Sequence, residues 1–172
     1  KHKRGSKLIV LDSNEKIVSK GKLFKSAWDA YYSDVIDYRT GSAVVKVDAS
    51  TRTISTNFDD IHADVGNVIP NQRASDTVDL AGLRPEGRRW CPVDPWTYES
   101  TVHSGIHIVG DATDATTVGK VPKSGFIANS MGKVCAFAVV ALMNGEKPPR
   151  PSMANTCYSL VSETEGISVT AV

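Results

Sequence analysis

The chain has 172 residues, of which 41% are hydrophobic and 23% charged, a composition typical of globular proteins rather than of disordered ones. Its formal net charge is +1, which does not favour nucleic acid as a partner. The longest apolar run, residues 134–143, has about half of the roughly 20 residues that a transmembrane helix needs, so we expect no membrane span.

The first part of the chain alternates strand and helix patterns. Residues 7–12 (KLIVLD) are an apolar run ending in an acid, which is typical of a parallel strand. Helical spacing of apolar side chains predicts a helix over residues 20–32, and residues 35–41 predict a second strand. Alternating runs around residues 48–51 predict a hairpin, and residues 62–70 predict another strand. This order is typical of the back half of a nucleotide-binding α/β domain, although the sequence contains no GxGxxG turn.

The composition of residues 71–95 shifts to Pro, Gly, Arg and Asp, which predicts a crossover between domains. A short buried strand is predicted at residues 106–109, followed by a helix from Pro122 to Asn144 with Gly145 at its C-terminal end. Strands are predicted at residues 156–161 and 167–172. Because the chain starts without Met and ends within a predicted strand, we expect a fragment of a longer protein.

The end of the strand at 106–109 is the first candidate binding site. Gly110 would let a ligand approach the backbone, and the Asp111 carboxylate can accept hydrogen bonds from a pair of hydroxyl groups. The following helix carries a small-residue face, composed of Ser124, Gly125, Ala128 and Gly132, which would allow cofactor or backbone to come close. A simple capping turn explains the same pattern equally well.

The chain has three cysteines, so at least one lacks an intrachain disulfide partner, and no zinc-binding spacing occurs among them. Cys135 lies in an apolar segment and is interpreted as a small buried hydrophobe. Cys91 and Cys157 lie in polar contexts and are the better reactive candidates. From the residues alone, a structural thiol is the simpler interpretation of Cys157.

Five segments follow one another in the second half of the sequence: WCPVD, GIHIVGDA, PKSGFIANSMGK, VVALMNGEKP and NTCYSLVSETEGISV. Together, and in this order, they are similar to the flavoprotein subunit of flavocytochrome c sulfide dehydrogenase, within the pyridine-nucleotide-disulfide-oxidoreductase-like flavoproteins. The resemblance implies an α/β flavoprotein with two dinucleotide-binding domains. Residues 1–79 would form the back half of the NAD(P)-binding-like domain, residues 80–150 the second segment of the FAD-binding domain, and residues 151–172 the start of a C-terminal α+β interface domain.

The same resemblance implies FAD as cofactor and assigns the site residues, with no metal ligands among them. Asp111 would bind the ribityl hydroxyls, and the segment before the helix would lie beside the isoalloxazine ring. Cys157 would be one half of a redox-active disulfide, with its partner in an earlier segment that this chain lacks. The implied cofactor-binding residues are Gly110, Asp111, Val121, Pro122, Lys123 and Ser124.

The resemblance implies a periplasmic enzyme that oxidises sulfide to sulfur or polysulfide and passes electrons to a c-type cytochrome subunit. The haem must come from that partner, since this sequence has no CxxCH. The alternatives are a sulfide:quinone oxidoreductase, an NAD(P)H-dependent disulfide reductase or NADH dehydrogenase, and an inactive truncated remnant. In the NAD(P)H-dependent alternative, Asp12 would occupy the place of a ribose-binding acid.

Overall fold

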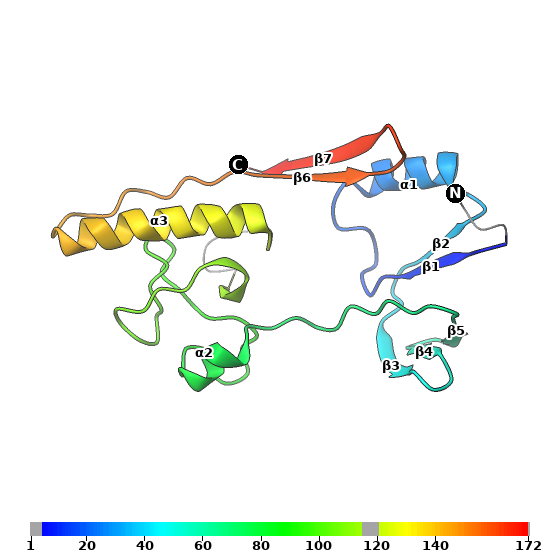
Figure 1. The fold of residues 1–172 in the computed structure, drawn as a ribbon, viewed down its shortest axis with the longest axis horizontal. Coiled ribbons are helices and arrows are strands. Elements are labelled where there is room, and N and C mark those ends of the chain that lie inside the picture. The colour runs from blue at the N-terminus through cyan, green and yellow to red at the C-terminus, as the bar shows by residue number, and fades with distance from the viewer. Residues whose placement is uncertain (1–4, 115–120, 172) are drawn as a thin grey trace. The chain divides into compact units, whose positions relative to one another are not determined.

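The computed structural model describes residues 5–114 and 121–171 and combines helices and strands (Figure 1), in agreement with the mixed α and β content predicted from sequence. It divides into two compact units. Unit 1 comprises Lys1–Ile69 with Tyr158–Val169, and unit 2 comprises Pro70–Cys157 with Thr170–Val172. The domain boundaries at 79/80 and 150/151 stay predictions.

Unit 1 begins with a strand–helix–strand element, as the sequence predicted. Strands β1 (Leu8–Leu11) and β2 (Ile36–Arg39) pair in parallel, with Leu8 opposite Ile36. Helix α1 (Gly21–Tyr31) connects them, and its Trp28 ring lies 5.5 Å from the Tyr38 ring of β2, measured between centroids. Helix α1 therefore contacts the strand that follows it through Trp28.

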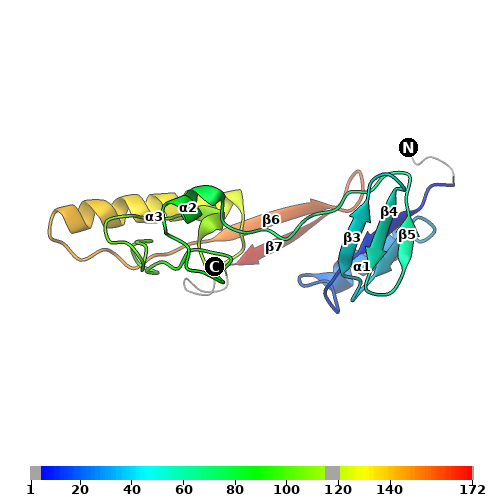
Figure 2. The ribbon, with the colours of Figure 1, turned by 90° about the horizontal axis from the view of Figure 1, so that it is seen from below.

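The predicted hairpin is present and is extended by one strand. Strands β3 (Val44–Asp48), β4 (Thr53–Thr56) and β5 (Asp60–His62) form an antiparallel sheet (Figure 2). The strand predicted at residues 62–70 is wrong, because β5 ends at His62. His62 lies opposite Thr53, the first residue of β4, so the chain beyond His62 has no β4 residue with which to pair.

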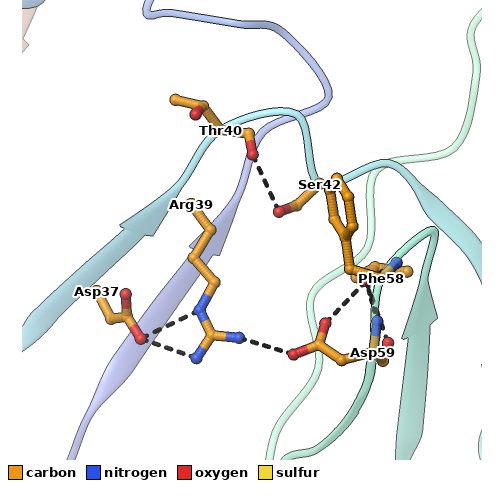
Figure 3. Close-up of polar contacts among 7 residues, drawn as sticks. Asp37, Arg39, Thr40, Ser42, Phe58 and Asp59 are labelled. Atoms are coloured by element: carbon orange, nitrogen blue, oxygen red, sulfur yellow. Dashed lines mark hydrogen bonds and ion pairs between the residues drawn. The ribbon is translucent and has the colours of Figure 1, made fainter.

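A polar clamp connects β2 with the turn between β4 and β5. Arg39 donates to Asp37 Oδ2 at 2.9 Å and to Asp59 Oδ2 at 3.2 Å (Figure 3). The Thr56 hydroxyl donates to the second oxygen of Asp59, Oδ1, at 2.9 Å. Charged hydrogen bonds of this kind link the two sheets where apolar contact is sparse.

Unit 2 is built around a hydrophobic core and contains α2 (Asp76–Leu80), the short 3₁₀ helix η1 (Gly110–Ala112) and α3 (Gly125–Met143). The buried strand predicted at residues 106–109 is wrong, because only His107 forms a bridge and Ile106 is 42% exposed. Ile108 N–H donates to the carbonyl of Tyr98, whose φ of 58° is left-handed, and this turn prevents a longer ladder. The core residues are Ala74, Leu83, Cys91, Val93, Tyr98, Ile108, Ile127 and Met131.

Helix α3 ends as predicted but begins later. Gly145 follows it with a φ of 72°, the left-handed conformation that glycine favours at a helix end. The helix starts at Gly125 because Ser124 is extended and its hydroxyl accepts the Ile127 N–H. The placement of Pro122 in the first helical turn is therefore wrong, since Pro122 precedes the N-cap by two residues.

Two final strands, β6 (Asn155–Leu160) and β7 (Gly166–Ala171), form a two-stranded sheet. They agree with the predicted strands at 156–161 and 167–172, except that residue 172 lies outside the described residues. Cys157 therefore occupies a strand position.

Candidate functional site

The Gly110–Asp111 turn lies directly against α3. A Cβ atom at Gly110 would be 3.3 Å from Ala128 Cβ, and the φ of Gly110 is 72°. Its N–H donates to the sulfur of Met131, which is 2% exposed, at 3.2 Å. Glycine is thus required here both by backbone conformation and by the close approach of the helix.

Lys123 fixes the same turn from the other side. Its Nζ donates to the carbonyl oxygens of Asp111 at 2.6 Å and Thr113 at 2.7 Å. It also lies 3.8 Å from the centroid of the Trp90 ring, a cation–π contact. Desolvation lowers the pKa of Lys123, and the nearby carboxylates of Asp111 and Asp114 oppose that shift. The lysine therefore shapes the backbone of the turn in addition to adding positive charge.

A small hollow of about 10 Å³, room for about one water molecule, opens between the turn, the segment before α3 and the helix itself. Five of the six predicted cofactor residues line it, and the sixth, Ser124, caps α3 beside it. The structure thus brings together residues that are more than ten positions apart in the sequence. The lining residues are Gly110, Asp111, Thr113, Val121, Pro122, Lys123, Ile127 and Met131.

The chemistry of this hollow fits one part of a flavin. Asp111 is exposed, and within the described ranges no donor occupies its carboxylate, which leaves acceptor sites for hydroxyl groups. Pockets that enclose a whole ligand of moderate size have about 300–1,000 Å³, so this much smaller hollow would contact FAD along its rim rather than enclose it. The roles of the six residues toward the cofactor stay predictions.

The predicted small-residue face of α3 is wrong at two of its positions. A Cβ atom at Gly125 or at Gly132 would meet nothing within 4 Å, and Gly125 is exposed. The close approach occurs instead at Ala128, against Gly110. Glycine is therefore needed in the turn rather than in the helix that packs on it.

The three cysteines are free thiols with different surroundings. Cys157 is exposed on β6, in agreement with its predicted accessibility, and is not paired with the other two. Cys91 is completely buried and does not qualify as the reactive candidate that its polar sequence context suggested. Cys135 is half-buried, and burial raises the pKa of both Cys91 and Cys135.

Sequence reasoning missed Asn155, which connects Cys157 with the start of α3. Its side chain is 2% exposed and bonds to Cys157 Sγ and to the Ser124 hydroxyl. The motif NTCYS had drawn attention to the cysteine alone, since nothing in the sequence distinguishes a buried asparagine from an exposed one. Trp90, Thr113 and Met131 were missed for the same reason.

Asp12 does not have the free carboxylate that a ribose site needs. Its Oδ2 accepts from the Tyr38 hydroxyl at 2.6 Å, and its Oδ1 accepts from both the backbone and the side chain of Asn14. The Tyr38 hydrogen bond holds the pKa of Asp12 below its ordinary value. Both oxygens of the carboxylate therefore already accept hydrogen bonds from neighbouring residues.

Two further features of the described residues concern metal binding and membrane association. No group of three or more His, Cys, Asp or Glu side chains among them could hold a metal ion. Helix α3 is long and apolar enough to cross a membrane by length and composition, a test that core helices of soluble proteins also pass. The expectation of no span depended on uninterrupted apolar runs, of which residues 134–143 form only part of this helix, and it stays a prediction.

Comparison with solved structures identifies a similar fold. A chain in the cryo-EM structure of the Tetrahymena thermophila mitochondrial ATP synthase F1Fo composite tetramer matches with a TM-score of 0.68 at 16% identity. The match covers 94% of this chain and 40% of that one, so this chain spans less than half of its length. At this identity the likeness concerns the fold alone.

Two family models match the two ends of the sequence. Residues 1–70 match the central part of the sulfide dehydrogenase (flavocytochrome c) flavoprotein chain, and residues 149–172 match the flavin-binding part of flavocytochrome c sulfide dehydrogenase. The two matches together cover more than half of the sequence, and the residues that line the hollow lie between them in the sequence, outside both. The second match shows that the cofactor is FAD. The chain belongs to the family of the flavoprotein chain of flavocytochrome c sulfide dehydrogenase.

Proposed function

We propose that this chain is part of a periplasmic, FAD-dependent sulfide dehydrogenase that passes electrons to a c-type cytochrome subunit. The observation that carries the proposal is Cys157, which lies within the flavin-binding match and is exposed and unpaired. A cysteine that reacts with sulfide must be reached by solvent and must be available for a partner elsewhere in the protein. Cys157 meets both requirements, whereas the buried Cys91 does not.

The proposed chemistry is a thiol–disulfide exchange at Cys157. Hydrosulfide attacks the Cys157 sulfur of a disulfide formed with a cysteine outside this sequence. A new S–S bond gives the Cys157 persulfide, the old S–S bond breaks, and its electron pair leaves on the partner thiolate. Sulfide sulfur is thereby oxidised and the disulfide reduced. FAD, when bound, would supply a two-electron acceptor for the electron pair that the partner thiolate then carries.

The residues around the hollow would hold the cofactor in place. Asp111 would accept hydrogen bonds from ribityl hydroxyls, and residues 121–124 would lie beside the ring system. Lys123 would keep the turn in shape through its two carbonyl contacts. We further propose the two-dinucleotide-domain fold for the whole protein, with α3 as a core helix, since Ile127 and Met131 belong to the core of unit 2.

The NAD(P)H-dependent alternative has less support. Its ribose-binding acid would be Asp12, whose carboxylate already accepts hydrogen bonds from Tyr38 and Asn14. Mixing the purified protein with NADH and following flavin absorbance separates the two alternatives, and we expect no bleaching. A flavin spectrum of the purified protein also tests the idea of an inactive remnant.

Two substitutions in the FAD-loaded protein test the proposal. Cys157→Ser should retain FAD but reduce sulfide-dependent cytochrome c reduction by orders of magnitude, because serine cannot form a persulfide. Asp111→Ala should weaken FAD retention after dialysis by roughly tenfold or more, since a hydrogen bond to a charged group contributes about 1.5–3 kcal/mol. Cys135→Ala is the matched control and should turn over normally. Normal turnover in Cys157→Ser would refute the role of Cys157.

A further inference from the structure

Asn155 is the first residue of β6 and is unusually buried for an amide side chain. Only 2% of it is exposed, although Cys157, two positions further along the same strand, is exposed. Burial of an amide is unfavourable unless its donors and acceptor are hydrogen-bonded. The contacts of Asn155 therefore need a physical account.

Both ends of the Asn155 amide are in use. The Ser124 hydroxyl donates to Oδ1 at 2.9 Å, and Nδ2 donates to Cys157 Sγ at 3.3 Å. The two bonds use different atoms of one planar group, so the orientation of the amide determines whether a donor or an acceptor faces the sulfur.

The N-cap of α3 fixes that orientation. Ser124 Oγ accepts the Ile127 N–H at 3.2 Å, so its own proton is free to be donated to Asn155 Oδ1. With the carbonyl oxygen held by Ser124, the NH₂ group must point toward Cys157. The start of α3 thereby determines which group of Asn155 faces the sulfur.

We propose that Asn155 is a positioning residue for Cys157, which holds the sulfur in one orientation and donates a hydrogen bond to it. The inference deepens the proposed function. A nearby N–H donor favours negative charge on the sulfur. In the proposed function Cys157 carries that charge as the thiolate from which the disulfide forms again. Ser124 also caps the helix beside the hollow. The two hydrogen bonds Ser124–Asn155–Cys157 therefore connect the reactive thiol to the segment predicted to lie beside the flavin.

Asn155→Asp in the FAD-loaded protein separates the two hydrogen bonds. The carboxylate keeps an acceptor for Ser124 but, when ionised at pH 8, has no proton to donate to sulfur. After reduction of the protein, Cys157 is alkylated with iodoacetamide, and the rate at each cysteine is measured by peptide mass spectrometry. We expect Asn155→Asp to slow alkylation of Cys157 about fivefold or more. Ser124→Ala keeps the Asn155 NH₂ donor but removes the hydroxyl that holds Asn155 Oδ1, so it should slow alkylation of Cys157 less than Asn155→Asp does.

Tyr158→Phe is the matched control, because Tyr158 is the next residue on β6 and is 79% exposed. In this variant Cys157 should be alkylated at the wild-type rate. The half-buried Cys135 provides an internal reference in every sample. Equal Cys157 rates in Asn155→Asp and in wild type would overturn the proposal.

A second measurement does not depend on whether Asn155→Asp folds. Cys157→Ala removes the acceptor, so the Asn155 side-chain NH₂ should exchange with solvent several-fold faster by NMR than in wild type. An unchanged exchange rate would also overturn the proposal. Neither measurement uses sulfide or cytochrome c. If the protein proved not to oxidise sulfide but Asn155→Asp still slowed alkylation of Cys157, the proposed function would fail and the role of Asn155 would stand.

Discussion

Unit 2 is held together by a core of eight buried residues, among them Tyr98, Val93 and Cys91, none of which is exposed. Unit 1 has few buried side chains, and two of its buried residues, Ser42 and Thr56, are polar. Strand ladders and polar contacts such as the Arg39 clamp therefore contribute a larger share of its structure.

The difference indicates where the chain can hold a group rigidly. Unit 2, which has the packed core, contains the hollow, the Gly110 turn and the hydrogen-bonded residues Ser124, Asn155 and Cys157. A binding or reactive group keeps its geometry when the residues that support it are fixed by packing. Substitutions in the two units test this contrast.

Tyr98→Ala should be the most destabilising substitution. The ring is fully buried in the core of unit 2, and its hydroxyl donates to the sulfur of Met153 at 3.3 Å. Removal of a large buried aromatic side chain costs about 3–5 kcal/mol. Urea unfolding should show this loss, whereas Ile61→Ala in unit 1 should cost about 2 kcal/mol, at the lower end of its class. Equal losses of unfolding free energy in the two variants would mean that the cores of the two units are packed equally well.

Gly110→Ala should destabilise unit 2 by about 1–3 kcal/mol, because its left-handed backbone disfavours a Cβ atom and Ala128 leaves little room for one. Flavin retention should fall together with the thermal unfolding midpoint. Gly125→Ala is the matched control, since an added Cβ meets nothing within 4 Å there, and it should keep both values close to wild type. A harmless Gly110→Ala would show that the turn and α3 do not require this close approach.

Tyr38→Phe in unit 1 should have the smallest effect, and the effect should depend on pH. The Tyr38 hydrogen bond lowers the pKa of Asp12 below 3.8, so its stabilisation is present above that value and is lost as pH falls through the lowered pKa. The same bond raises the pKa of Tyr38 from 10.0 to about 12, so the stabilisation is lost again as pH rises through about 12.

Unfolding free energies of wild type and Tyr38→Phe should therefore differ most between about pH 5 and 9, where both groups are in their bonded forms. The exposed Tyr158→Phe serves as the control and should show no such profile. A difference that stays constant from acid to alkali would mean that the Asp12–Tyr38 bond contributes nothing measurable.

The sequence predicted the elements whose signals are local. The apolar run of β1, the helical spacing of α1, the alternation of β3 and β4, and Gly145 after α3 all concern residues close together in the chain. The resemblance to the flavoprotein family also indicated six residues, five of which do line one hollow. Periodicity and turn chemistry act over a few residues, so they can be recognised without the rest of the molecule.

Only the tertiary structure decided how these segments meet. It placed Gly110 against Ala128, directed Lys123 onto two carbonyl oxygens, and buried Asn155 between Ser124 and Cys157. It also replaced the predicted strand at 106–109 with a single bridge, because that segment borders a left-handed turn at Tyr98. Pairing and burial depend on neighbours that are distant in sequence, and local residue patterns carry no information about which neighbour will be present.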